Sequence, residues 1–147
     1  NDRICHIHGS GQAGQVIMGH GNLDSIKKYR EEATEKIEKL DKNGAEISNG
    51  IYEFYQASFK DTKKILKWHE REMENYQGIE EIYVFGHSLG KVDMPYFQKI
   101  KKYVSNNANW YFYIYNETEK SILDKIEDLK IKDEHIYILP SEQFYTM

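Results

Sequence analysis

The chain has 147 residues, about the length of one domain, and 20 Lys and Arg against 24 Asp and Glu give a net charge of −4. That balance argues against a nucleic-acid-binding module, which neutralises phosphates with a dense basic face. The single cysteine excludes an internal disulfide framework, and no apolar run approaches the roughly 20 residues of a membrane span. We therefore expect a cytoplasmic protein that forms a single α/β domain over residues 1–147.

The chain opens on a strand pattern. Residues 3–8 are typical of a short strand, residues 9–14 form a Gly-rich stretch, and a second short apolar run covers residues 15–18. A natural domain seldom begins inside its own core, and this sequence has no initiator Met. We therefore expect the carboxyl-terminal fragment of a longer protein, whose upstream part would be a partner of this one.

Two long helices are expected next. Apolar residues recur at steps of three and four from Ile26 to Leu40, which is the pattern of one helix face, and Lys42-Asn43-Gly44 is typical of a helix end. A second apolar stripe predicts a helix from Ser48 to Tyr76. Residues 24–76 are thus predicted to be a long helical-hairpin insertion.

The rest of the chain alternates strand and helix patterns. In chain order, the expected elements are a strand at 81–85, a helix at 94–104, a strand at 110–115, a helix at 118–129 and a strand at 135–139. Asp93 is predicted to cap the first helix by accepting a hydrogen bond from the amide of Tyr96, and Asn116 to cap the second. The alternation predicts a Rossmann-like, mostly parallel sheet with helices on both faces.

The most specific short motif is Gly86-His87-Ser88-Leu89-Gly90, directly after a predicted strand. It satisfies G-x-S-x-G, the nucleophile elbow of serine hydrolases, and His135 would be the base. Against this, the next helix is expected to begin at Asp93-Met94-Pro95, not at the serine. The alternative is a ligand-binding turn at the carboxyl end of a strand, where Gly86 lets the backbone approach a ligand and Ser88 can bond ribose or phosphate oxygens.

The histidines offer an incomplete set of metal ligands. His6 and His8 lie on one face of the first predicted strand, and His20 or His87 could be a third zinc ligand. No cysteine pair or carboxylate is spaced to complete such a site, and residues 69–73 form H-E-x-x-M, which lacks the second histidine of a zincin. We predict no metal site.

Two motifs together resemble the bacteriophage abortive infection AbiH family. Ile7-His8-Gly9 matches a short strand end of that family, and Phe85-Gly86-His87-Ser88-Leu89-Gly90, followed by Asp93, Tyr96 and Phe97, matches a longer and more specific block. The resemblance implies a role in defence against phage, with the biochemical activity unspecified.

A more distant similarity is to sirtuin-like NAD-binding domains. It implies NAD as the cofactor and His8 as the catalytic base. The residues that it implies as cofactor contacts are Gly9, Ser10, Gly86, His87, Ser88, Asp93 and Asn116. The Gly-rich phosphate loop and the Asn-x-Asp motif of those domains are not in this sequence, so we expect part of such a site to lie upstream.

Three hypotheses follow. The first is an abortive-infection defence protein whose small-molecule partner is a nucleotide such as NAD, with neither a membrane nor a nucleic acid as partner. The second is a serine hydrolase that uses Ser88 and His135. The third is a non-enzymatic interaction domain in which the motifs serve packing and capping. The sequence assigns neither a reaction nor an oligomeric state.

Overall fold

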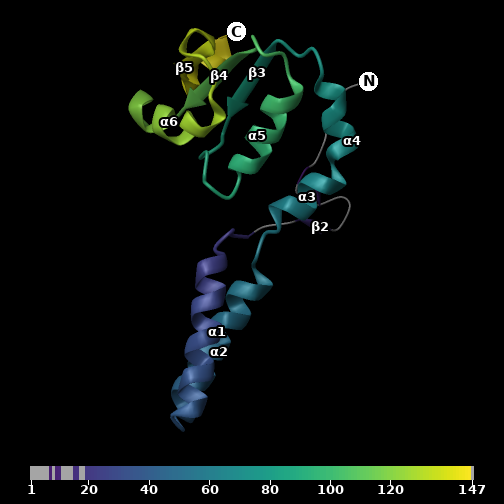
Figure 1. The fold of residues 1–147 in the computed structure, drawn as a ribbon. Helices are drawn as coiled ribbons and strands as arrows, with labels where there is room; N and C mark the ends of the chain where they lie inside the picture. The colour runs from purple at the N-terminus through teal and green to yellow at the C-terminus, as the bar shows by residue number, and fades with distance from the viewer. Residues whose placement is uncertain (1–6, 8, 11–14, 17–18, 147) are drawn as a thin grey trace. The chain divides into compact units, whose positions relative to one another are not determined.

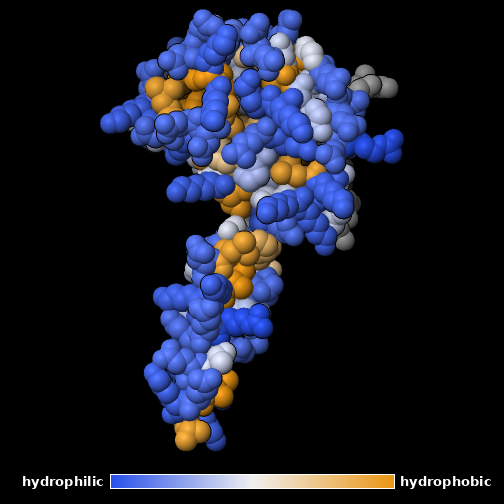
Figure 2. Space-filling view, viewed as in Figure 1, coloured by the Kyte–Doolittle hydropathy of each residue, from blue (hydrophilic) through white to orange (hydrophobic). Residues whose placement is uncertain are grey.

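The computed structural model describes residues 7, 9–10, 15–16 and 19–146, and the chain forms two compact units, Asn1–Asp61 and Thr62–Met147 (Figure 1). The boundary between the units falls inside the predicted 24–76 insertion. No helix in the described part of the chain is both long enough and apolar enough to cross a membrane. Figure 2 shows a mostly hydrophilic surface with small hydrophobic patches in both units.

Two helices of 16 residues dominate the first unit. α1 (Leu23–Glu38) and α2 (Lys42–Ala57) lie side by side (Figure 1). Tyr29 of α1 stacks on Tyr55 of α2 with 5.8 Å between ring centroids, and Lys36 Nζ donates to the buried Ser48 Oγ at 2.9 Å. One stripe of each helix is thereby partly buried, with Ala33, Ala45 and Ser48 fully so, and the charged faces stay in solvent.

The turn between α1 and α2 differs from the prediction. Leu40 adopts a left-handed conformation with φ +61° just after α1, and Asp41 caps α2 by accepting a hydrogen bond from the amide of Gly44 at 3.0 Å. An Asp side chain that bonds an amide three residues later begins a helix. The prediction that Lys42-Asn43-Gly44 ends a helix is therefore wrong, because these residues open α2.

The predicted helix from Ser48 to Tyr76 is also wrong. After α2 the chain continues as α3 (Thr62–Trp68), α4 (Glu70–Met73) and the 3-10 turn η2 (Glu74–Tyr76). The break at 58–61 has a tertiary cause: the His20 amide donates to the Ser58 carbonyl, and the Lys60 amide donates to the His20 carbonyl. This bridge takes the backbone of residues 58–60 out of helical geometry.

Two short strands are described in the amino-terminal region. β1 (Gly9–Ser10) and β2 (Gln15–Val16) pair antiparallel. Apart from Ile7, which lies in a turn, the strand predicted at residues 3–8 lies outside the described residues. The run predicted at 15–18 is described only for the two residues of β2.

A parallel three-stranded sheet forms the second unit, in the order β3-β4-β5. The strands are β3 (Glu81–Phe85), β4 (Asn109–Ile114) and β5 (Ile136–Pro140), each within one residue of its prediction. The connecting elements are α5 (Met94–Tyr103), α6 (Glu119–Ile126) and the 3-10 turns η3 (Glu127–Leu129) and η4 (Asp133–His135), and η5 (Ser141–Thr146) follows β5. This open parallel sheet is compatible with a Rossmann-like fold.

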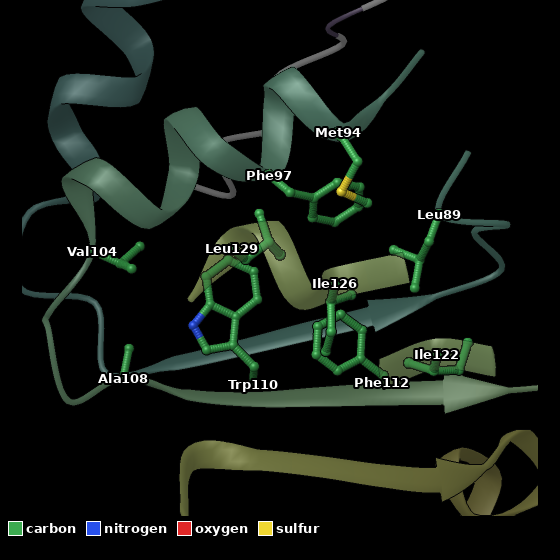
Figure 3. Packing of buried hydrophobic residues seen from close by; sticks show 10 residues of the cluster. All are labelled: Leu89, Met94, Phe97, Val104, Ala108, Trp110, Phe112, Ile122, Ile126 and Leu129. Carbon is green, nitrogen blue, oxygen red and sulfur yellow. The ribbon is translucent and has the colours of Figure 1, made fainter. Parts of the chain in front are cut away.

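Both connecting helices pack on the same face of the sheet (Figure 3). Trp110 and Phe112 of β4 point to this face and are 0 % and 1 % exposed. The rest of the buried cluster is Leu89, Met94, Phe97, Val104, Ala108, Ile122, Ile126 and Leu129. Since the strand order runs in one direction and crossovers are right-handed, successive helices fall on one side.

The opposite face carries a row of tyrosines. Tyr83, Tyr111 and Tyr137 are aligned across the three strands, with 4.8 Å between the ring centroids of each neighbouring pair. At the carboxyl end of this face, Phe144 of η5 stacks on Phe85 of β3. The sheet was predicted to have helices on both faces. In the described second unit, α5 and α6 cover one face, and only the 3-10 turn η5 lies on the other, at its carboxyl end.

Candidate functional site

A cavity of about 640 Å³ lies at the carboxyl edge of the parallel sheet. Two loops border it: residues 86–93 follow β3, and residues 115–118 follow β4. The residues that line the cavity are Phe85, Gly86, His87, Ser88, Tyr113, Ile114, Tyr115, Glu117, Ile122, Ser141, Glu142 and Phe144. Ligands of open parallel sheets bind at this edge, because the loops after the strands converge there.

The first loop leaves β3 at Gly86, which has φ +63°. Two residues after His87, Leu89 is also left-handed, with φ +51°, and its side chain is 3 % exposed in the core, so it anchors the loop. Helix α5 begins only at Met94. A nucleophile elbow instead places the serine on a sharp turn directly before its helix.

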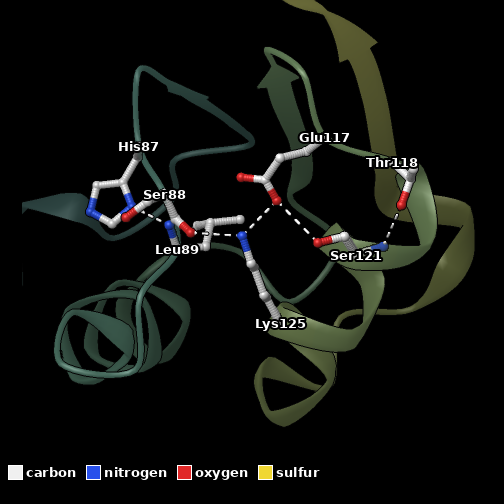
Figure 4. Close-up of polar contacts among 7 residues, drawn as sticks. All are labelled: His87, Ser88, Leu89, Glu117, Thr118, Ser121 and Lys125. Atoms are coloured by element: carbon white, nitrogen blue, oxygen red, sulfur yellow. Dashed lines mark hydrogen bonds and ion pairs between the residues drawn. The ribbon is translucent and has the colours of Figure 1, made fainter.

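His87 links this loop to the start of α5. Its Nδ1 accepts a hydrogen bond from the Leu89 amide at 2.9 Å, and its Nε2 lies 3.6 Å from Asp93 Oδ2 (Figure 4 shows the first contact). Because Nδ1 is an acceptor, a neutral His87 carries its proton on Nε2, on the side of Asp93. The ring also packs edge-on against Phe97, with 5.0 Å between centroids.

Asp93 stands at the N-cap position of α5, but its side chain makes no capping bond. The amide of Tyr96 instead donates to the backbone carbonyl of Asp93 at 3.0 Å. The predicted side-chain cap is therefore wrong. The physical reason is the competing histidine, since the carboxylate lies beside His87 Nε2.

The second loop also differs from its prediction. Asn116 has φ +55°, a conformation that Asn tolerates better than most residues, and it does not cap α6. Thr118 is the cap and accepts a hydrogen bond from the Ser121 amide at 3.2 Å (Figure 4). Asn116 lines a smaller neighbouring hollow, where it lies beside Glu119 and Pro140, and is not among the lining residues of the main cavity.

Lys125 of α6 joins the two loops (Figure 4). Its Nζ donates to the backbone carbonyl of Ser88 at 3.0 Å and to Glu117 Oε2 at 2.5 Å. Ser121 Oγ donates to the same carboxylate oxygen at 3.1 Å. The hydrogen bond from Lys125 is the largest cause of a lowered pKa of Glu117, and the hydrogen bond from Ser121 is the next.

Replacing Lys125 with Met is expected to destabilise the protein at pH 7 and to matter less in acid. Because the pKa of Glu117 is lowered in the folded protein, its ionised form stabilises the fold above about pH 4.5, the ordinary value of a glutamate, and this stabilisation is lost as the pH falls through the folded pKa. Urea unfolding of the wild type and Lys125→Met at pH 7, 5 and 3.5 measures the difference.

The matched control is Lys132→Met, which removes an exposed lysine 3.5 Å from the exposed Glu134. Such surface pairs contribute little, so this variant should match the wild type at every pH. A Lys125→Met deficit that stays the same at pH 3.5 would attribute the effect to packing of the lysine stem and contradict the charge interpretation.

The structure brings together part of the predicted site. Gly86, His87 and Ser88 line the cavity, and Asp93 contacts His87. Gly9 and Ser10 form β1 in the other unit, and His8 and His6 lie outside the described residues. In the described part of the chain, no group of three His, Cys, Asp or Glu residues could hold a metal ion.

Sequence reasoning missed Glu117, which lines the cavity, and the two residues that bond to its carboxylate, Ser121 and Lys125. Glu117, Ser121 and Lys125 follow one another at steps of four, which places Ser121 and Lys125 on one side of α6 and Glu117 just before its N-cap, Thr118. That spacing was a usable signal for the network. Glu142 and Phe144, from η5 after the last strand, had no comparable pattern.

The predicted pair of Ser88 and His135 does not form. His135 precedes β5, and its Nδ1 lies 3.0 Å from Asn109 Oδ1 at the amino end of β4, whereas Ser88 follows the carboxyl end of β3. The five residues of β3 separate these ends by about 16 Å at 3.3 Å per residue. His135 is therefore too far away to activate Ser88.

Comparison with known protein families decides the relationship. A family model described as bacteriophage abortive infection AbiH matches residues 1–115. The chain belongs to the AbiH family. The match covers both Ile7-His8-Gly9 and the block from Phe85 to Phe97, and it supports a role in abortive-infection defence against phage. No curated protein and no solved structure matches this AbiH chain.

Proposed function

We propose that this AbiH chain is a phage-defence protein that binds a nucleotide, with NAD as the first candidate, at the carboxyl edge of its parallel sheet. One observation carries the proposal: a cavity of about 640 Å³ lies between the loops that follow two adjacent parallel strands. Its volume is within the range of small-molecule and cofactor sites.

The lining of the cavity suits such a ligand. Phe85 and Phe144 offer exposed aromatic surface on which a base can pack, and the buried Tyr113 supports Phe144 edge-on. Gly86 lets the ligand approach the backbone, and the hydroxyl of Ser88 can bond a ligand oxygen. The resemblance to sirtuin-like domains implies His8 as the catalytic base and Gly9 and Ser10 as further contacts of the cofactor.

A serine hydrolase is the less favoured alternative. His135 contacts Asn109 and is out of reach of Ser88. The adjacent His87 already accepts a hydrogen bond from the Leu89 amide and faces Asp93. Activation of a serine requires a base within hydrogen-bond reach of its hydroxyl.

Titration calorimetry of the 147-residue protein with NAD tests the proposal. We expect saturable binding to one site, weakened about 2- to 10-fold by Ser88→Ala, since one hydrogen bond contributes roughly 0.5 to 1.5 kcal/mol. Ser105→Ala is the matched control, because Ser105 precedes the amino end of β4, at the opposite edge.

Two outcomes would contradict the proposal. The first is the absence of NAD binding at millimolar concentration by a protein whose circular dichroism shows it to be folded. The second is covalent labelling of Ser88 by a fluorophosphonate probe, lost in Ser88→Ala, which would favour the hydrolase.

A further inference from the structure

The charges around the cavity are negative. Glu117 and Glu142 line it, and none of the described lining residues is Lys or Arg. Lys125 is the cation that contacts Glu117, and its ammonium already donates to that carboxylate and to the Ser88 carbonyl. Because Lys125 offsets the charge of Glu117, the lining of the cavity keeps the negative charge of Glu142.

The helix ends at this edge are also occupied by acidic or capping side chains. A free helix N-terminus attracts phosphate through its unpaired amides and its dipole. At α6, Thr118 accepts from the Ser121 amide, with Glu117 before it and Glu119 in the first turn. At α5, Asp93 holds the N-cap position. A phosphate at either place would meet a carboxylate at short range.

Neutral groups of a nucleotide, in contrast, find partners here. Phe144 stacks on Phe85 with 4.7 Å between centroids, and Tyr113 packs edge-on against Phe144 at 5.4 Å. Phe85 and Phe144 are 58 % and 38 % exposed, so ring surface remains for a base. The Glu142 carboxylate accepts hydrogen bonds and does not donate, which suits the two hydroxyls of a ribose.

We infer that the cavity takes the uncharged nucleoside part of the nucleotide, its base and its 2′- and 3′-hydroxyls, and leaves the phosphates outside. The inference rests on the proposed function and specifies which part of the ligand this edge binds. In NAD, the pyrophosphate would then extend out of the cavity into solvent or toward other parts of the protein.

Calorimetric titration of the 147-residue protein with adenosine, AMP and the 2′- and 3′-deoxyadenosines tests this assignment. We expect adenosine to bind at least as tightly as AMP. Each deoxyadenosine should bind roughly tenfold or more weakly than adenosine, because a hydrogen bond to a carboxylate contributes about 1.5 to 3 kcal/mol.

A charge reversal separates a ligand contact from a structural role. Glu142→Lys should weaken adenosine binding more than AMP binding, because both ligands lose the contact to the ribose hydroxyls but the lysine attracts only the phosphate of AMP, whereas damage to the fold would weaken both equally. Glu142→Gln should weaken adenosine binding less, because the amide oxygen still accepts. The matched control is Glu127→Lys, an exposed charge reversal in η3, which should change neither affinity.

The outcomes distinguish this inference from the proposed function. AMP binding more tightly than adenosine to the wild type, or deoxyadenosines binding as tightly as adenosine, would overturn the inference and leave nucleotide binding intact. Absence of binding by NAD, adenosine, AMP and both deoxyadenosines would overturn both.

Discussion

Phe112→Ala is expected to lower the free energy of unfolding of the second unit by about 3 to 5 kcal/mol, the usual cost of deleting a buried phenylalanine side chain. Phe112 is 1 % exposed and belongs to the cluster between β4 and helices α5 and α6 (Figure 3). Its ring centroid lies 6.1 Å from that of Trp110. Removing the ring leaves a cavity that the surrounding helices fill only in part.

Urea unfolding followed by tryptophan fluorescence measures this loss. Both tryptophans of the chain, Trp68 and Trp110, belong to the second unit, so the signal reports on that unit. Phe85→Ala is the matched control, because Phe85 is on a neighbouring strand but 58 % exposed. We expect it to cost less than about 1.5 kcal/mol. Equal losses in the two variants would show that the cluster is not the core of the unit.

The strands could be predicted from the sequence because their signal is local. Glu81–Phe85 and Ile136–Pro140 are short apolar runs rich in β-branched and aromatic residues, bounded by turn residues, and such runs become strands wherever they pack. The start of α5 at Met94 was likewise predicted, since Pro95 favours the first turn of a helix.

The helical region could not be predicted in the same way. The apolar stripe continues past Ser58, so periodicity alone favours one long helix. The break depends on hydrogen bonds between His20 and the backbone of residues 58–60, which are about forty positions away along the chain. Helices α5 and α6 share one face of the sheet because the strands follow one another in the order β3-β4-β5. The periodicity of a sequence does not reveal that order.

In the site, too, the local features could be predicted and the tertiary contacts could not. Gly86, His87 and Ser88 line the cavity, because a glycine-containing turn after a parallel strand falls at the edge of the sheet where ligands bind; their contact with a cofactor stays a prediction. The role of Asp93 was missed, because an Asp before a helix usually caps it, and here a histidine six residues earlier lies beside its carboxylate. Capping rules consider one residue at a time, so they do not include a histidine that competes with the helix amides for the Asp93 carboxylate.

Gly86→Ala and Gly90→Ala are expected to change stability in opposite directions. Gly86 has φ +63°, and an alanine there costs about 1 to 2 kcal/mol because its Cβ crowds the backbone in the left-handed region. No atom lies within 4 Å of a Cβ built at Gly86, so the cost is conformational and not a clash. Gly90 is outside the left-handed region, and its nearest neighbour would be Ser88 Oγ at 3.8 Å.

Alanine at position 90 should therefore stabilise the protein by about 0.4 to 1 kcal/mol, because it restricts the unfolded chain without straining the folded one. Gly86→Asn should fall between the two, since Asn tolerates φ above zero. Urea unfolding measures all three variants. Gly86→Ala should also weaken NAD binding, because relief of its strain moves the backbone that borders the cavity, whereas Gly90→Ala should leave binding unchanged. Equal effects of alanine at positions 86 and 90 would contradict the left-handed turn at Gly86 and, with it, the approach of a ligand to this backbone.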